Sequence, residues 1–414
     1  MKSHKFSQII PLTAIFIFAV FSLLFVTSCK DDDDVALQYE VAVTVNYPEG
    51  YAESLASGIA VTATNTLSGA NHSATTGTDG VANFRLSSGV YNFTAVGETE
   101  EFAFNGNLSN ITIAENGSRT ITLTAAALGG GLVIKEFYYT GSKTPEGGNY
   151  FSDQFLELYN NSDEVIYLDG IGIGGLTPTT SWSPSVWVDA AGNLQSRLPV
   201  QNYTAVFPGN GTQHPLQPRT SVVIAQDGIN HKSDPAGNPN SPVNLGNADW
   251  EYYVGDLNGG RDADAAGVPN LKVIYTTTTT FVDQLYSVFG AAIIVFKLPE
   301  GTTPEAYVES AANFSTQPGA SATTQYLLIN KEYVLDAVEF VDTDPSRRYK
   351  RMPADLDAGY AYDPTGTYSA KSTRRKVKQI IDGKAIYKDT NNSTEDFLSG
   401  QTPSPKVHST VVEP

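Results

Sequence analysis

Cysteine is nearly absent from this 414-residue chain, in which Cys29 is the only one. One cysteine cannot close a disulfide within the chain, so stability depends on packed apolar cores, which a chain of this length can bury. Charged residues make up only 17% of the chain, and 26 bases face 44 acids. The resulting net charge of −18 argues against nucleic acid as a partner, because an acidic surface repels it.

The residue patterns of common catalytic sites are also missing. His72, His214, His231 and His408 are far apart and form no i, i+4 pair, so their spacing gives no support to a zinc site. Neither a Gly-x-Ser-x-Gly elbow nor a glycine-rich phosphate loop followed by lysine occurs. We therefore predict a protein that is not an enzyme, with no catalytic residue and no organic cofactor.

The N-terminus has the pattern of a bacterial lipoprotein signal. Lys2 and Lys5 precede an apolar run over residues 9–26, and small residues then lead to Cys29. This order predicts a signal peptide over residues 1–28, cleaved before a cysteine that takes the lipid. The alternative is a transmembrane helix, for which the run is borderline against the roughly 20 residues required. The extreme N-terminal position and the adjoining cysteine favour the signal.

An acidic run follows the predicted lipidation site, and we assign residues 29–38 to the lipidated cysteine and an acidic tether. The run resembles the surface-export signal of Bacteroidota lipoproteins, which places a lysine and several acids behind the lipidated cysteine. The matching residues are Lys30, Asp31, Asp32, Asp33 and Asp34. The resemblance implies a protein anchored in the outer membrane and exposed at the cell surface. A solvated spacer is an alternative that is compatible with it.

Residues 39–126 predict a small β-sandwich. Val41, Val43 and Val45 alternate along one strand, and Asp79-Gly80 supplies the chemistry of a tight turn. The segments GIAVTATNTLSG and TGTDGVANFRLSSGVYNFTA resemble the carboxypeptidase-regulatory-like fold, a transthyretin-like sandwich. That resemblance implies a spacer or docking module, and a generic Ig-like pattern is the alternative. Three consecutive glycines then predict a linker over residues 127–131.

Residues 132–414 are again β-rich, so we predict an all-β protein of two sandwich modules. Apolar or alternating runs occur over residues 132–139, 154–162, 165–173, 220–225, 291–297 and 334–340. The segments FLELYNNSDEVIYLDGIGI, PLQPRTSVVIA, VLDAVEF and KDTNNSTEDFLSGQTPSPK resemble, in order, the lamin-tail domain, an Ig-like sandwich. Residues 174–220, 226–288 and 342–385 read as long insertions. Lamin-tail domains generally serve as binding or supporting modules, so the resemblance implies no shared catalytic site.

Two groups in the insertions are candidates for binding. The tryptophans Trp182, Trp187 and Trp250 either pack small cores under the loops or anchor a partner or sugar. One loop carries oxygen-bearing side chains at alternating positions, which suits a hard cation such as calcium; they are Asp256, Asn258, Asp262 and Asp264. Because this loop lacks the full ligand pattern of a calcium loop, a solvated acidic turn is the alternative.

Two basic runs, over residues 347–351 and 374–378, contrast with the acidic chain. Either they form a basic patch that meets an acidic partner, or their side chains pair with nearby acids of the same chain.

Together these patterns predict an accessory binding protein for nutrient capture or for a TonB-dependent transporter. A structural or adhesion protein is the main alternative, and a hydrolase with its site in the insertions is the third.

Overall fold

The computed structural model describes residues 37–51, 53–99, 101–127 and 131–414. The predicted signal peptide, Cys29, the run Asp31–Asp34 and the centre of the predicted linker lie outside these residues. The described chain consists mostly of β-strands in several sheets, which confirms the predicted all-β class. Its helices are short, and within the described ranges none has the length and apolarity needed to cross a bilayer.

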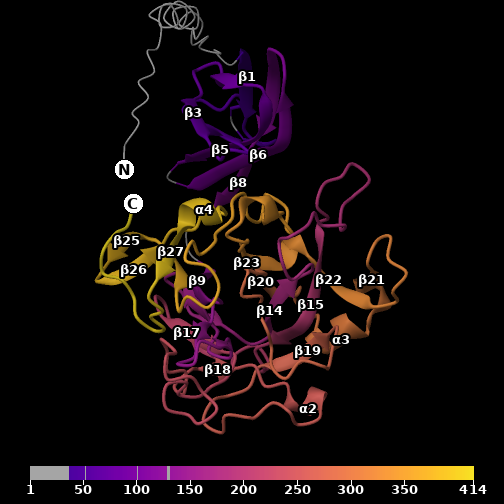
Figure 1. Cartoon of the computed structure of the whole chain (residues 1–414), viewed down its shortest axis with the longest axis vertical. Coiled ribbons are helices and arrows are strands. Elements are labelled where there is room, and N and C mark those ends of the chain that lie inside the picture. The colour runs from indigo at the N-terminus through magenta and orange to yellow at the C-terminus, as the bar shows by residue number, and fades with distance from the viewer. Residues whose placement is uncertain (1–36, 52, 100, 128–130) are drawn as a thin grey trace, which may run out of the picture. The chain divides into compact units, whose positions relative to one another are not determined.

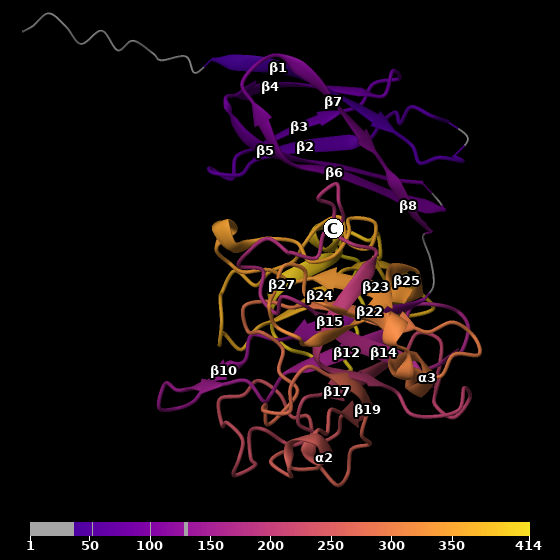
Figure 2. The same cartoon turned by 90° about the vertical axis from the view of Figure 1, so that its right-hand side faces the viewer.

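The strands of residues 38–127 form two sheets that pack on one another (Figures 1 and 2). One sheet has the order β4-β1-β7, with β1 (Gln38–Asn46), β4 (Val81–Ser87) and β7 (Gly117–Thr122). The other has the order β3-β2-β5-β6-β8, with β2 (Ala60–Asn65), β3 (Asn71–Thr75), β5 (Gly89–Glu98), β6 (Phe102–Ile113) and β8 (Thr124–Ala127). The alternation along β1 buries Val41, Val43 and Val45 in the core shared with Phe93 of β5.

The strands of residues 132–401 form two larger sheets, most of whose strands are labelled in Figure 1, and three separate two-stranded sheets. The first large sheet has the order β18-β17-β12-β9-β24-β27, with β9 (Leu132–Tyr138), β12 (Phe155–Asn160), β17 (Ser221–Ala225), β18 (Trp250–Glu251), β24 (Ser372–Arg375) and β27 (Phe397–Gln401). The second has the order β21-β22-β15-β14-β20-β23, with β19 paired to β15. Its strands are β14 (Ile171–Leu176), β15 (Arg197–Val206), β19 (Lys272–Thr276), β20 (Ala292–Lys297), β21 (Phe314–Thr316), β22 (Gln325–Asn330) and β23 (Val334–Glu339).

Short elements connect these strands. The small pairs are β10 (Ser142–Lys143) with β11 (Asn149–Tyr150), β13 (Ile166–Tyr167) with β16 (Pro215–Leu216), and β25 (Val377–Ile381) with β26 (Lys384–Tyr387). The helices are α2 (Gly255–Asn258), α3 (Pro304–Glu309) and α4 (Ser393–Asp396), with 3₁₀ turns at Ala311–Asn313, Lys331–Tyr333 and Pro345–Arg347.

The main core of this part lies between the two large sheets. Ile134 and Leu156 of the first sheet pack in one apolar cluster with Ile173 and Val295 of the second. The side chains that point away from this core are buried as well, because the segments between strands cover both outer faces. Tyr307 of α3 covers Phe296 on one face, for example, and other loop residues cover Tyr138 and Phe155 on the opposite face.

Burial on both faces explains why several strands read as continuous apolar runs. It also revises the predicted insertions. Residues 174–220, 226–288 and 342–385 contain β15, β19 and β24, which pair within the two large sheets. These segments are therefore partly sheet and partly the layers that cover it.

Candidate functional site

The three tryptophans have different surroundings. Trp250 is 7% exposed and packs edge-on against Phe207, and Trp187 is 3% exposed and packs edge-on against Tyr326. Both tryptophans are therefore packing residues, and Trp250 belongs to the main core between the large sheets and not to a separate small core under a loop. Trp182 is 42% exposed and is therefore the tryptophan that a partner can reach.

Trp182 is held in place by residues from two other segments. Its Nε1 donates a hydrogen bond to Asp342 Oδ2 at 2.6 Å, and its ring centroid lies 4.8 Å from that of Phe289 in an edge-on arrangement. The guanidinium carbon of Arg347 lies 5.0 Å from the indole centroid. These contacts fix the indole while part of it stays in solvent. We define Trp182, Phe289 and Arg347 as the Trp182 surface.

A shallow cleft with room for about one water molecule opens beside the Trp182 surface. Phe289 and Asp342, which both contact Trp182, line it together with Tyr139 and Asp363. The cleft is therefore too small to enclose a ligand, and a ligand at this place would lie across the surface.

The four predicted calcium ligands do not share one environment. Asp256 is exposed in α2, whereas the side-chain nitrogen of Asn258 donates to the main-chain oxygens of residues 281 and 282. Asp264 accepts a hydrogen bond from Asn270 at 3.0 Å. Of these four residues, Asp262 is the one whose carboxylate lies close to two other carboxylates among the described residues.

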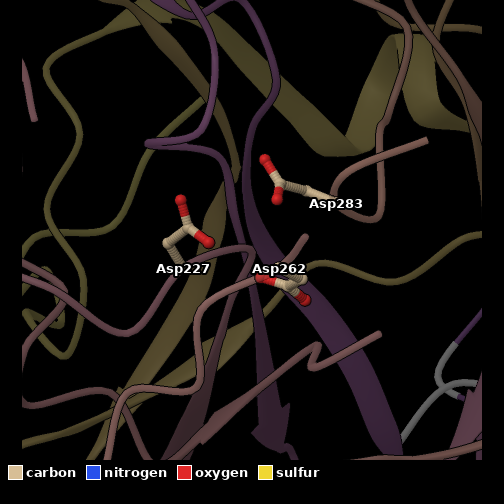
Figure 3. Close-up of side chains that lie close together, drawn as sticks. All are labelled: Asp227, Asp262 and Asp283. Atoms are coloured by element: carbon tan, nitrogen blue, oxygen red, sulfur yellow. The ribbon is translucent and has the colours of Figure 1, made fainter. Parts of the chain in front are cut away.

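Asp262 lies beside Asp227 and Asp283, and Figure 3 shows the three side chains close together on separate loops. Asp227 follows β17, Asp262 follows α2, and Asp283 lies between β19 and β20. One carboxylate oxygen of each residue lies within 4.8 Å of those of the other two. Asp262 is only 6% exposed. We define these three residues as the acidic cluster.

The acidic cluster is held by hydrogen bonds. The main-chain nitrogen of Val254 donates to Asp262 Oδ2 at 2.7 Å. Ser152 Oγ and Gln226 Nε2 donate to Asp283 Oδ2 at 3.2 and 3.3 Å. Within the described residues, no lysine, arginine or histidine forms an ion pair with any of the three carboxylates.

Burial without a counter-charge shifts the titration of the cluster. Burial, with repulsion from Asp283 and Asp262, raises the pKa of Asp227 to about 8. Burial likewise raises the pKa of Asp262 to about 6 and raises the pKa of Asp283. Two full charges about 4 Å apart repel by about 4 kcal/mol at an effective dielectric constant of about 20. Without a cation, Asp227 therefore holds its proton at neutral pH.

His231 fixes the chain next to the cluster. Its Nε2 lies 3.1 Å from the main-chain oxygen of Asp227, and its Nδ1 lies 2.7 Å from the hydroxyl of Tyr150. Burial lowers the pKa of His231 to about 4, so the ring is neutral. Nε2–H therefore donates to Asp227, and Nδ1 accepts from Tyr150. Both ring nitrogens are in use.

Comparison with known proteins finds a similarity for the part of the chain that holds this cluster. Residues 217–404 match the model of a protein family of unknown function, DUF4876. We call these residues the DUF4876 region, after the family that they resemble. No curated protein matches the sequence.

The structure of a DUF4876 protein extends the similarity to most of the chain. A crystal structure of a DUF4876 family protein from Bacteroides thetaiotaomicron is 28% identical over 91% of this chain and 98% of that chain, with a TM-score of 0.60. The Bacillus anthracis TIE protein aligns at 9% identity over 45% of this chain and 28% of that chain, with a TM-score of 0.18, too low to indicate a shared fold.

The two basic runs lie in the DUF4876 region and mostly pair internally. Arg351 forms a fully buried ion pair with Glu339 at 2.7 Å, and Arg375 forms one with Asp336 at 2.6 Å. The structure thus favours the interpretation of internal pairing for these bases. Arg347 is different, because it is half exposed and belongs to the Trp182 surface.

Proposed function

We propose that the protein is a non-enzymatic, surface-exposed lipoprotein of the outer membrane that binds an extracellular ligand. It would act as an accessory to nutrient capture or to a TonB-dependent transporter. The observation that carries the proposal is the Trp182 surface, an exposed indole fixed by Asp342 and Arg347 beside a shallow cleft. Tryptophan and arginine are enriched among the residues that dominate binding energy. Binding residues also concentrate on loops that a rigid scaffold positions.

The rest of the proposal relies on the sequence. The lipoprotein signal, Cys29 and the acidic run Asp31–Asp34 support anchoring and export. The resemblance of residues 39–125 to a carboxypeptidase-regulatory-like domain supports a spacer. The resemblance of residues 132–414 to a lamin-tail domain supports a binding module, which is the part that carries Trp182.

The test compares the full chain with a Trp182→Ala variant against a panel of soluble oligosaccharides and peptides, by affinity electrophoresis and calorimetry. Removal of an anchor of about 2 kcal/mol weakens binding roughly thirtyfold. Leu67→Ala is the matched control, because Leu67 is 96% exposed and lies in the first sandwich. If Trp182→Ala left binding unchanged, the Trp182 surface would not be the ligand-binding site. The same would follow if Leu67→Ala weakened binding equally.

A further inference from the structure

We propose that Asp227, Asp262 and Asp283 bind one Ca²⁺ ion through their carboxylate oxygens, with Gln226 as a further oxygen ligand. The ion would join three loops of the DUF4876 region. This inference goes beyond the proposed function and is independent of the Trp182 surface.

The spacing of the oxygens fits calcium. Ca–O distances are about 2.3–2.6 Å, so two oxygens on one Ca²⁺ ion lie at most about 4.6–5.2 Å apart. One oxygen of each of the three aspartates lies within 4.8 Å of the others, close to the span of one such coordination sphere. Mg²⁺, with distances of about 2.0–2.1 Å, would require the oxygens to move to within about 4.2 Å. The present spacing therefore favours the larger ion.

Gln226 supplies a second, independent observation. Its side chain is almost completely buried at 2% exposure, and its Oε1 has no hydrogen-bond partner among the described residues. The amide ends at the acidic cluster, because its Nε2 lies 3.3 Å from Asp283 Oδ2. A half-turn of the amide exchanges oxygen and nitrogen with little change in shape. In that orientation Gln226 Oε1 would face the carboxylate oxygens of the cluster. Two acceptor oxygens repel at such a distance, and only a cation between them makes the approach favourable.

The surrounding charges point the same way. Elsewhere in this sandwich some buried acids face a buried base, as Glu339 faces Arg351. Arg261, the neighbour of Asp262 in sequence, instead directs its guanidinium to the main-chain oxygens of Asn258 and Thr279. The acidic cluster thus collects three carboxylates and has no base among the described residues to neutralise them.

The donor atoms select against softer metals. Carboxylate, amide and hydroxyl oxygens surround the cluster, and hard cations prefer such ligands. Zinc sites use histidine nitrogen or cysteine sulfur. His231 is the nearby imidazole, and its two nitrogens already bond Asp227 and Tyr150.

The experiment uses the full chain in detergent, stripped with EDTA and titrated with CaCl₂ by calorimetry. Extracellular calcium modules bind at about 10⁻⁴–10⁻³ M, and we expect a dissociation constant in this range. MgCl₂ should bind at least tenfold more weakly. Asp283→Asn and, separately, Asp227→Asn should each remove one Ca²⁺ per chain. The control is Asp256→Asn, which changes an exposed acid of the nearby helix α2 and should leave binding unchanged.

Thermal unfolding provides a signature that a purely structural carboxylate would not give. Calcium bound to the native state raises the melting temperature of the native protein by mass action. In EDTA, Asp283→Asn should melt at or above the native protein, because it removes repulsion from the empty cluster. In about 5 mM CaCl₂, roughly five- to fiftyfold above the expected dissociation constant, the order should reverse. A native protein that calcium neither binds nor stabilises would overturn the proposal. Equal losses in Asp256→Asn and Asp283→Asn, or an Asp283→Asn protein less stable in EDTA, would overturn it too.

Discussion

Arg375 shows how strongly a single buried charge determines stability in this protein. Its guanidinium is almost completely buried and contacts the carboxylates of Asp336, at 2.6 Å, and Asp396, at 3.4 Å. Arg375→Met would keep the apolar volume but leave these carboxylates unpaired. We expect the free energy of unfolding to fall by about 3–5 kcal/mol, measured by urea denaturation.

The control for Arg375 is Arg347→Met. Arg347 is half exposed and lies 3.8 Å from Asp344, and such a surface pair contributes only about 0–1 kcal/mol. If both variants lost the same small amount of stability, the buried contacts of Arg375 would not carry the stabilisation assigned to them.

Also at the scale of residues, the sequence led to Asp262 but not to Asp227 and Asp283. The alternating acids around Asp262 are visible in one loop, whereas the acidic cluster forms only where three distant loops meet. One signal was present, because Asp227 stands just after the apolar run 220–225, at the end of a predicted strand.

The surroundings of the tryptophans could not be predicted from the sequence either. All three lie between strong strand patterns, and only tertiary packing distinguishes the exposed Trp182 from the buried Trp187.

At the scale of elements, strands with strong apolar patterns could be predicted from the sequence. The predicted runs 132–139, 291–297 and 334–340 match β9, β20 and β23 closely. The predicted strand 165–173 is instead divided into β13 and β14, because Gly170 adopts a positive φ of 74° between them. Strand β15 was not predicted. Pro199, Gln201 and Asn202 interrupt its apolar pattern, although its other residues are largely buried between β14 and β22.

Strand β14 depends on glycine where it crosses the large Phe296 side chain of β20. A β-carbon added at Gly172 would overlap the Phe296 ring. Gly172→Ala should therefore lower the free energy of unfolding by about 1–3 kcal/mol, as overpacking does. Gly175→Ala in the same strand is the matched control, because its nearest neighbour, Tyr286, lies 4.0 Å away.

Urea denaturation of both glycine variants measures this effect, and Phe296→Leu combined with Gly172→Ala gives a direct check. The smaller leucine makes room for the methyl group, so the double variant should lose less stability than the sum of the two single changes. Strict additivity would mean that the two side chains do not compete for the same space.

At the scale of the whole molecule, the described residues contain apolar cores made from separate stretches of sequence. One core uses residues from Val41 to Leu123, and the main core of the larger part uses residues from Leu132 to Phe397. The described strands of residues 38–127 pair with one another, as do those of residues 132–401. A part that buries its own core can fold without a covalent neighbour.

We therefore expect a chain cut at a protease site placed within residues 127–131 to keep both parts folded. Scanning calorimetry before and after cleavage should show two transitions, and each purified fragment should retain its own. The first part has fewer than 100 residues and buries a smaller share of its surface, so its transition should have the smaller enthalpy. Separate melting would support independent modules. If either fragment lost its cooperative transition after cleavage, that part would depend on the other for its fold, and the predicted boundary would be wrong.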